Sequence, residues 1–301
     1  MEMEKIKCNI CGADDYEIVY PSLYSEKYNV VELFKSSGDE PSKDQIVKCK
    51  HCGLIYVNPR IQPEKIIEGY SEGTDEKFVS QAEGREKTFT RSLKLIEKYV
   101  PLGKLLDIGT AGGSFLAAAK KRGWQVFGIE PNKWLCEWGK KNYDIEINQG
   151  TLEKNDFEPS SFDLVTLWDV LEHVPDPSDT LTRINKLLKI NGTLVVNYPD
   201  IGSSVAKLMK RKWVFVLTVH LFYFTPSTIK KILEKCGFEV IIIKKHWQTL
   251  QLGYLASRFE PYSKTVCKIA TKTVQTLGLK DVQFPYWLGQ TFVIARKKEE
   301  K

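Results

Sequence analysis

Short apolar runs alternate with helical patterns along the middle of this 301-residue chain. Turns that contain Gly, Pro or Asp separate them, and this spacing is typical of an α/β fold. The pattern predicts strands at 104–108, 125–129, 145–148, 163–168 and 193–198. It predicts helices at 113–122, 132–141 and 178–189, the last of them closed by a C-cap at Asn191-Gly192.

The elements that follow complete the predicted sheet. A helix is expected from Pro226 to about Cys236, followed by a strand-like run at 238–244 and a final strand at 291–295. This order predicts an α/β protein with a mostly parallel, seven-stranded, Rossmann-like sheet, helices on both faces and one antiparallel strand. The stretches near 200–224 and 247–288 fall outside the alternation, and we expect them to form lids over the strand ends.

The region before the sheet has a different pattern. Apolar residues at helical spacing predict a helix at 84–100, and a short helix is expected at 63–70 with a turn at 71–74. We therefore expect three parts: a small N-terminal module at 1–62, a helical connector at 63–100, and a main domain at 101–301.

Four of the seven cysteines lie in two matching C-x-x-C-G knuckles. Cys8 and Cys11 form the first and Cys49 and Cys52 the second, which predicts a closed Cys₄ site for structural Zn²⁺. A redox site would need only one such pair, and a closed site leaves no position for catalysis. The other three cysteines are expected to be small buried residues, His51 a spacer, and the insert at 20–45 a hairpin with a loop.

Charge is unevenly distributed along the chain. The net charge is +6, yet residues 201–301 carry 18 Lys and Arg against 6 Asp and Glu. A basic C-terminal third attracts phosphate-bearing acceptors, anionic lipids or nucleic acid; alternatively, it is a solvated lysine-rich surface. Residues 1–62 carry 8 basic against 10 acidic residues, which disfavours a nucleic-acid finger. Because no signal peptide or membrane-length apolar run is present, we expect a soluble, cytoplasmic protein.

The Gly-rich turn after the first predicted strand indicates a nucleoside pocket. Asp107 lies inside the turn, two residues before Gly109, and Glu130 ends the second strand, where it can hold both ribose hydroxyls. A carboxylate in the turn would repel a pyrophosphate but suits a ligand with a cationic end, such as S-adenosylmethionine. A purely structural turn is the alternative interpretation.

Four ordered motifs resemble those of class I S-adenosylmethionine-dependent methyltransferases. They lie at residues 105–116, 126–131, 162–177 and 192–199. The segments at 220–226 and 53–60 are similar to one branch of that superfamily, whose members carry an N-terminal zinc-knuckle pair. Proteins of this branch often act in surface-polysaccharide, sugar or natural-product pathways.

The resemblance also implies a set of cofactor-binding residues. In this chain they are Asp107, Gly109, Thr110, Gly113, Glu130, Pro131, Leu152, Trp168 and Asp169. The chain departs from the family pattern at Ala111, where a second glycine is more usual. A methyl group is tolerable there at negative φ but would crowd the ligand at positive φ.

Methyl transfer needs alignment of the acceptor and removal of its proton. We predict His220 with Tyr223 as the catalytic pair and His173 as a further candidate, although a purely structural role for each histidine is also open. The sequence thus favours a small-molecule methyltransferase. We expect a sugar or related acceptor, free or linked to a nucleotide or carrier, that is methylated at oxygen rather than carbon. The alternatives are an RNA methyltransferase and a non-catalytic cofactor-binding scaffold. Contact with a membrane surface is a weaker expectation.

Overall fold

A computed structural model describes residues 3–24, 41–62, 71, 73–74, 76–260 and 263–299 of the chain. The short helix expected at 63–70 and the centre of the insert expected at 20–45 lie outside these residues. In the described part of the chain, no helix has the length and apolar character needed to cross a bilayer.

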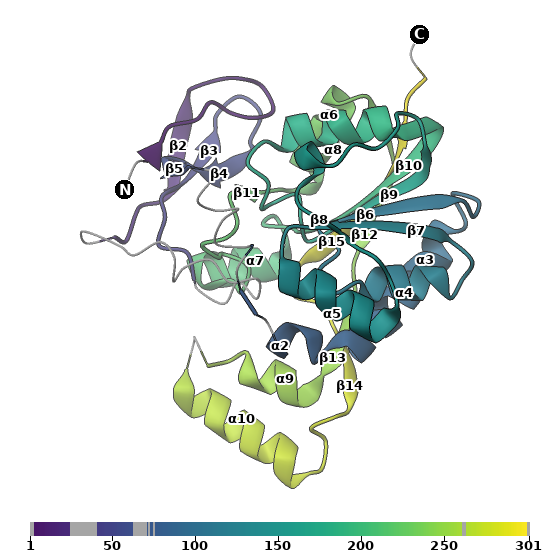
Figure 1. Cartoon of the computed structure of the whole chain (residues 1–301). Coiled ribbons are helices and arrows are strands. Elements are labelled where there is room, and N and C mark those ends of the chain that lie inside the picture. Colours follow the sequence, from purple (N-terminus) through teal and green to yellow (C-terminus); the bar gives the residue numbers. More distant parts are fainter. Residues whose placement is uncertain are drawn as a thin grey trace.

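The centre of the molecule is a seven-stranded sheet in the order β12-β15-β10-β9-β6-β7-β8 (Figure 1). Only β15 runs antiparallel to its neighbours β10 and β12, as the sequence predicts. The strands are β6 (Lys104–Ile108), β7 (Gln125–Glu130), β8 (Asn148–Gln149), β9 (Phe162–Trp168), β10 (Leu188–Pro199), β12 (Phe238–Lys245) and β15 (Gln290–Lys297).

Helices cover both faces of this sheet (Figure 1). On one face lie α3 (Ala82–Ile96), α4 (Ser114–Lys120) and α5 (Lys133–Tyr143), and on the other α6 (Pro177–Leu187) and α8 (Pro226–Lys235). Successive residues of the central strands alternate between the two layers: Leu105 belongs to one buried cluster and Leu106 to the other. Both faces of the sheet are apolar, which is why its strands read as continuous hydrophobic runs.

A separate four-stranded sheet contains the cysteine knuckles. Its strands β2 (Tyr16–Tyr20), β3 (Ile46–Cys49) and β4 (Ile55–Val57) come from the N-terminal region. The fourth strand, β11 (Phe222–Tyr223), comes from the first predicted lid and pairs antiparallel with β4. We call residues 3–24 and 41–62 the cysteine module; they also include the pair β1 (Met3–Glu4) and β5 (Arg60–Ile61). The lid therefore completes the sheet of the module.

The remaining elements surround the carboxyl ends of the central strands. The first lid contributes α7 (Ser204–Met209) and the 3₁₀ helix η2 (Lys210–Lys212), and a second 3₁₀ helix, η1 (Leu152–Lys154), follows β8. The second lid contains β13 (Gln248–Gln251), α9 (Leu252–Ser257), α10 (Lys264–Thr276) and β14 (Gln283–Tyr286), and α2 (Glu76–Val79) lies before α3. In Figure 1, α9 and α10 project from the lower edge of the molecule.

Two predicted boundaries are wrong. Helix α6 ends at Leu187 and β10 begins at once, so Asn191-Gly192 does not cap a helix. Instead it lies in an irregular part of β10 between Leu188 and Thr193, where Asn191 has φ 61°. The strand predicted at 145–148 is reduced to β8, because Ile145 and Ile147 pack their side chains into the core without pairing their backbone.

Candidate active site

A cavity of about 1210 Å³ lies at the carboxyl ends of β6, β7, β9 and β10. Chain order reverses here: the strand after β6 lies on one side of it and β9 on the other, and such switch points form the ligand crevice of open α/β sheets. The two predicted lids supply much of the opposite wall. The volume exceeds what a single small ligand usually fills, so the cavity has room for a cofactor and an acceptor.

The turn after β6 depends on Gly109. Its φ is +67°, and a Cβ added there would lie 2.6 Å from Cγ2 of Val170. Only glycine allows the turn to meet the loop after β9 so closely. Gly109 thus shapes the part of the cavity wall in which it lies.

Glu130 ties this turn to the neighbouring strand. Its Oε2 accepts a hydrogen bond from the Ala111 N–H at 2.8 Å, and its Oε1 accepts one from the Asn132 N–H at 2.9 Å. The side chain is buried yet lines the cavity. Burial raises its pKa to about 7, partly offset by these two hydrogen bonds. Each oxygen still has a lone pair that can accept a hydrogen bond from a hydroxyl group of a bound ligand.

Asp107, Thr110 and Gly113 lie behind the cavity wall, whereas Gly109, Glu130, Pro131, Leu152, Trp168 and Asp169 lie in it. Asp107 is buried, and its Oδ1 accepts a 2.6 Å hydrogen bond from Thr166 Oγ1 on β9. Burial raises its pKa to about 7. Asp107 thus joins β6 to β9, and its contact with the cationic end of a ligand stays a prediction.

The raised pKa values of Asp107 and Glu130 also bear on stability. In an unfolded chain both carboxyl groups lose their protons near pH 4, whereas in the fold they keep them up to about pH 7. The folded state therefore holds more protons in this window. Their contribution to the free energy of unfolding is greatest below pH 4 and decreases as the pH rises towards 7.

Asp169 lies at the tip of β9 in a strained conformation. Its φ is 54°, and its Oδ1 accepts a 2.7 Å hydrogen bond from Asn197 Nδ2 on the adjacent strand. Burial raises its pKa to about 6, with Arg85 acting in the opposite direction. Strain of this kind is characteristic of functional sites and persists because neighbouring contacts hold it.

Three titratable side chains meet in the same cavity beyond Asp169. Glu172 and His173 follow β9, His220 precedes β11, and one possible ligand atom from each lies within 4.8 Å of the other two. The two imidazole rings meet edge to face at 4.6 Å between centroids. Such a set can exchange a proton with a hydroxyl, and it is also a donor set that divalent cations accept.

Both histidines are neutral at pH 7. Burial lowers the pKa of His173 to about 4, and burial together with the neighbouring His173 lowers the pKa of His220 well below its usual value. His173 Nδ1 donates to the Val219 carbonyl at 2.9 Å. Nδ1 of His220 and both carboxylate oxygens of Glu172 are buried without a hydrogen-bond partner among the described residues. Unpartnered polar atoms on residues that line a cavity indicate a place for a polar ligand group.

Tyr223 does not join His220 at the cavity. Its hydroxyl donates to the Leu217 carbonyl at 3.3 Å, and its ring is buried against Ile46 and Val57 of the cysteine module. Within β11, adjacent side chains point to opposite faces, and His220 lies before the strand. The structure thus brings His220 together with His173 and Glu172. The Tyr223 ring lies 6.2 Å from that of His220 between centroids, as we expected, but its hydroxyl is directed to Leu217.

Comparison with known proteins places this arrangement in a family. A model described as a methyltransferase domain matches residues 81–242. This chain belongs to the class I S-adenosylmethionine-dependent methyltransferases.

Individual relatives agree with this assignment. The methyltransferase chain is 28% identical over 156 residues to a ubiquinone biosynthesis O-methyltransferase of Schizosaccharomyces pombe, covering 48% of this chain and 54% of that protein. It is 34% identical over 166 residues to the protein of the same name from Saccharophagus degradans, covering 48% and 70%. A methyltransferase structure from Thermotoga maritima shares the fold, with a TM-score of 0.51, 21% identity and coverage of 74% and 94%. The chain thus spans only about half the length of the Schizosaccharomyces pombe relative.

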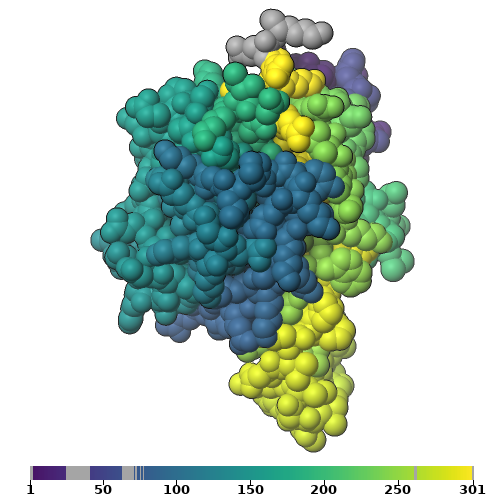
Figure 2. All heavy atoms as spheres, turned by 90° about the vertical axis from the view of Figure 1, so that its right-hand side faces the viewer, coloured from purple at the N-terminus to yellow at the C-terminus, as the bar shows by residue number. Residues whose placement is uncertain are grey.

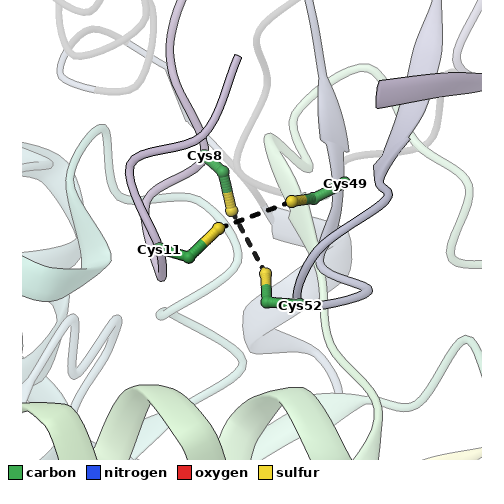
Figure 3. A group of neighbouring side chains, drawn as sticks. All are labelled: Cys8, Cys11, Cys49 and Cys52. Carbon is green, nitrogen blue, oxygen red and sulfur yellow. Dashed lines mark hydrogen bonds between the residues drawn. The ribbon is translucent and has the colours of Figure 1, made fainter. Parts of the chain in front are cut away.

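The side chains of the four knuckle cysteines point towards one another (Figure 3). All four Sγ atoms lie within 4.8 Å of one another, with Cys8 and Cys52 3.3 Å apart and Cys11 and Cys49 3.5 Å apart. Gly12 and Gly53, both at positive φ, donate their N–H groups to the carbonyls of Cys8 and Cys49 and close the two knuckles. Four thiols converging in this way fit the tetrahedral geometry of zinc, with Zn–S near 2.3 Å.

Sequence reasoning missed several residues of the methyltransferase cavity. Glu172 was read only as part of a motif, and Arg85 on α3 and Tyr286 on β14 were not considered. Glu172 directly precedes a candidate histidine, and that spacing was an available signal. Arg85 and Tyr286 line the cavity from elements that are remote in sequence from the other lining residues. No local sequence pattern identifies either of them as a site residue.

Ala111 gives a direct test of the turn geometry. Its φ is 49°, the positive value at which we expected the methyl group to crowd a ligand, and it lines the cavity. We predict that Ala111→Gly raises the free energy of unfolding by about 0.5–1 kcal/mol, because left-handed backbone strains alanine but not glycine. Denaturant unfolding would measure this change.

Ala118, buried within α4, is the matched control. Ala118→Gly is expected to lower the free energy of unfolding by about 1 kcal/mol or more, since glycine weakens a helix. Equal destabilisation by the two substitutions would contradict the assigned conformation of Ala111.

Proposed function

We propose that this chain transfers a methyl group from S-adenosylmethionine to a hydroxyl oxygen on an apolar ring compound. The main support is the continuity of the cavity: it runs from the Gly109 turn and Glu130, past two neutral histidines, to a wall of apolar side chains. That wall includes Leu208, Met209, Val214, Phe215, Leu255 and Phe259.

This proposal replaces the sugar acceptor that the sequence suggested. A sugar needs many hydrogen-bond partners, and an apolar wall would leave its hydroxyls unsatisfied. The curated relatives are named for O-methylation in ubiquinone biosynthesis, and ubiquinone is a quinone with a long apolar chain. A hydroxylated aromatic ring with an apolar substituent therefore fits the cavity better than a sugar does.

The proposed cofactor site comprises Gly109, Glu130, Pro131, Leu152, Trp168 and Asp169. Glu130 would accept the two ribose hydroxyls with its remaining lone pairs, and Leu152, whose side chain is buried in the wall, would flank the adenine. S-adenosylmethionine supplies the methyl group and its sulfonium leaving group, so the protein has to align the acceptor and remove its proton.

We assign proton removal to His220. His220 lines the cavity with a neutral ring, and its buried Nδ1 has no hydrogen-bond partner among the described residues, so we infer that it accepts a hydrogen bond from the acceptor hydroxyl. His173 is fixed by its bond to Val219 and contacts the ring of His220, so it acts as a positioning residue. Tyr223 lies outside the cavity wall and has no part in this scheme.

Replacement of His220 tests the function and the assignment together. With an alkyl-substituted catechol as acceptor, we predict that His220→Asn lowers kcat by about 10²–10⁴-fold, the usual contribution of a general base. The product methyl ether would be identified by mass spectrometry, and binding of S-adenosylhomocysteine would be followed by calorimetry and remain unchanged.

Two controls accompany that variant. Tyr223→Phe, next to His220 but outside the cavity wall, and His51→Asn, on the exposed cysteine knuckle, are expected to retain activity. Methylation of a nucleotide sugar with no turnover of any catechol would refute the proposed acceptor class. Full activity of His220→Asn would refute the base.

The pH dependence of cofactor binding tests the proposed part of Glu130. Because its pKa is about 7 in the free protein and ribose hydroxyls favour the ionised form, binding is expected to release a proton. We predict that the affinity for S-adenosylhomocysteine falls by about tenfold or more from pH 8 to pH 5.5. Glu130→Gln should bind more weakly and lose this dependence, whereas Asp107→Asn should keep it. A flat profile for the unaltered protein would exclude the proposed contact.

We further propose that Cys8, Cys11, Cys49 and Cys52 hold one structural Zn²⁺ and that residues 1–62 form a zinc-binding module. The module also contacts the segment that carries His220. Its strand β4 pairs with β11, which directly follows His220 and Leu221. Asn9 adds hydrogen bonds to Asp176 and Ser178 at the start of α6, the helix that follows the His173 loop. Zinc would thus stabilise the position of both histidines from a distance.

Removal of the metal is the corresponding experiment. We predict one zinc per chain by elemental analysis, and loss of it in Cys49→Ser but not in Cys267→Ser, which lies outside the cluster. Cys49→Ser is expected to lower the melting temperature and turnover while cofactor affinity changes little, because Gly109 and Glu130 are not part of the module. Metal-free protein with normal stability and turnover would contradict the proposal.

A further inference from the structure

The segment from Phe259 to Phe284 exposes an unusual amount of apolar surface. Seven of the fifteen exposed large apolar side chains among the described residues lie in it. They are Phe259 (49%), Val266 (48%), Ile269 (62%), Leu277 (62%), Leu279 (37%), Val282 (45%) and Phe284 (49%). The segment protrudes from the body of the molecule (Figure 2). Apolar side chains that gather at the surface of one segment are typical of an interaction site.

Helix α10 is amphipathic, and it turns an apolar stripe to solvent. Val266 and Ile269 lie three residues apart on one exposed side of the helix, and Leu277 lies just after its end. Ala270 and Val274, on the adjacent side, are half-buried where α10 meets α9. The stripe therefore takes no part in the packing of α10 against α9, two helices that we call the hairpin together with the residues between them. Helix α10 contains no buried residue.

Positive charge flanks this stripe. Lys264, Lys268 and Lys272 follow one another at intervals of four along α10, and Lys280 lies in the turn after it. All four are exposed, and none forms an ion pair with a carboxylate of a described residue. Only two acidic residues, Glu260 and Asp281, lie between Arg258 and Phe284. Apolar side chains beside unpaired lysines are the pattern of helices that lie in the interface of an anionic membrane.

The same surface borders the entrance to the cavity. Arg258 and Phe259, at the end of α9, line the cavity on the side of the hairpin. On the other side, Leu208 of α7 lines it while 84% exposed, and the exposed Lys212 follows in η2. The rim thus repeats the combination of apolar and basic side chains that α10 carries.

We propose that α10 and the rim of the cavity dock on an anionic lipid surface, with the mouth of the cavity turned towards the bilayer. The unpaired lysines select this partner over a second copy of the chain, because two such surfaces facing each other would place like charges together. The docked orientation would bring an apolar acceptor from the membrane to the cavity without crossing water. The surface argument does not depend on the acceptor assignment, since binding to lipid requires no turnover.

Vesicle co-sedimentation of the full chain tests this proposal. We expect binding to vesicles of phosphatidylglycerol and phosphatidylcholine, little binding to phosphatidylcholine alone, and weakening at high salt. Because each lysine near an anionic surface contributes about fivefold to partitioning, Lys268→Glu with Lys272→Glu is expected to weaken binding by at least tenfold. Ile269→Ser with Leu277→Ser is expected to weaken it as well, while turnover of a water-soluble catechol is retained.

Matched controls come from the opposite end of the molecule. Lys186→Glu on α6 and Ile190→Ser, which is 69% exposed, change charge and apolar surface without touching the hairpin. Equal loss of binding in these controls, or equal binding to neutral vesicles, would overturn the proposal. Absence of vesicle binding together with a dimer in sedimentation velocity, dispersed by Ile269→Ser with Leu277→Ser, would assign the surface to a second copy of the chain instead.

Discussion

The pairing of β11 with β4 is the contact on which the rest of the site depends. It joins a strand of the first lid to the sheet of the cysteine module, so two regions far apart in sequence become one structural unit. The N–H groups of Leu221 and Phe222 both donate to the Glu172 carbonyl. This places His220 opposite His173. Without the strand pair, nothing would fix the positions of the two neutral imidazoles and the carboxylate relative to one another.

This arrangement keeps polar groups buried, where unsatisfied atoms lower the free energy of unfolding. Glu172 and His220 are buried with unsatisfied atoms, and Asp169 keeps a left-handed backbone conformation. Each feature lowers stability by itself, and the surrounding core has to offset it. Buried aliphatic side chains on both faces of the sheet supply the stability that offsets this loss. The arrangement is therefore one in which a stable fold holds a reactive, poorly satisfied centre.

The same division explains how one domain can serve an apolar acceptor. The carboxyl ends of the parallel strands provide backbone turns and carboxylates, which suit a polar nucleoside. The two lids provide aliphatic and aromatic side chains together with an exposed, basic hairpin. In the proposed function, the polar cofactor and the apolar acceptor would meet where the strand ends and the lids face each other, in the cavity lined by His220 and Trp168.

Much of this protein is determined by sequence alone. The alternation of apolar runs and helical patterns predicted a mostly parallel, seven-stranded sheet with one antiparallel strand, and the repeated knuckles predicted the convergence of four cysteines. Both features are local: periodicity reports which side of an element is buried, and a short spacing brings two thiols together in any fold. The Gly109 turn and Glu130 were predicted for a similar reason, since strand ends and tight turns have their own residue preferences.

Other features were decided only by tertiary structure. Asp107 is turned away from the cavity towards Thr166, Tyr223 faces the cysteine module, and Glu172 joins the two histidines. The apolar stripe of α10 reads in sequence like any helix face that packs on a core, yet it is left exposed. A sequence pattern states which side chains favour burial or pairing. Which neighbours they meet depends on strand register and on contacts between distant segments, because only these fix the direction in which each side chain points.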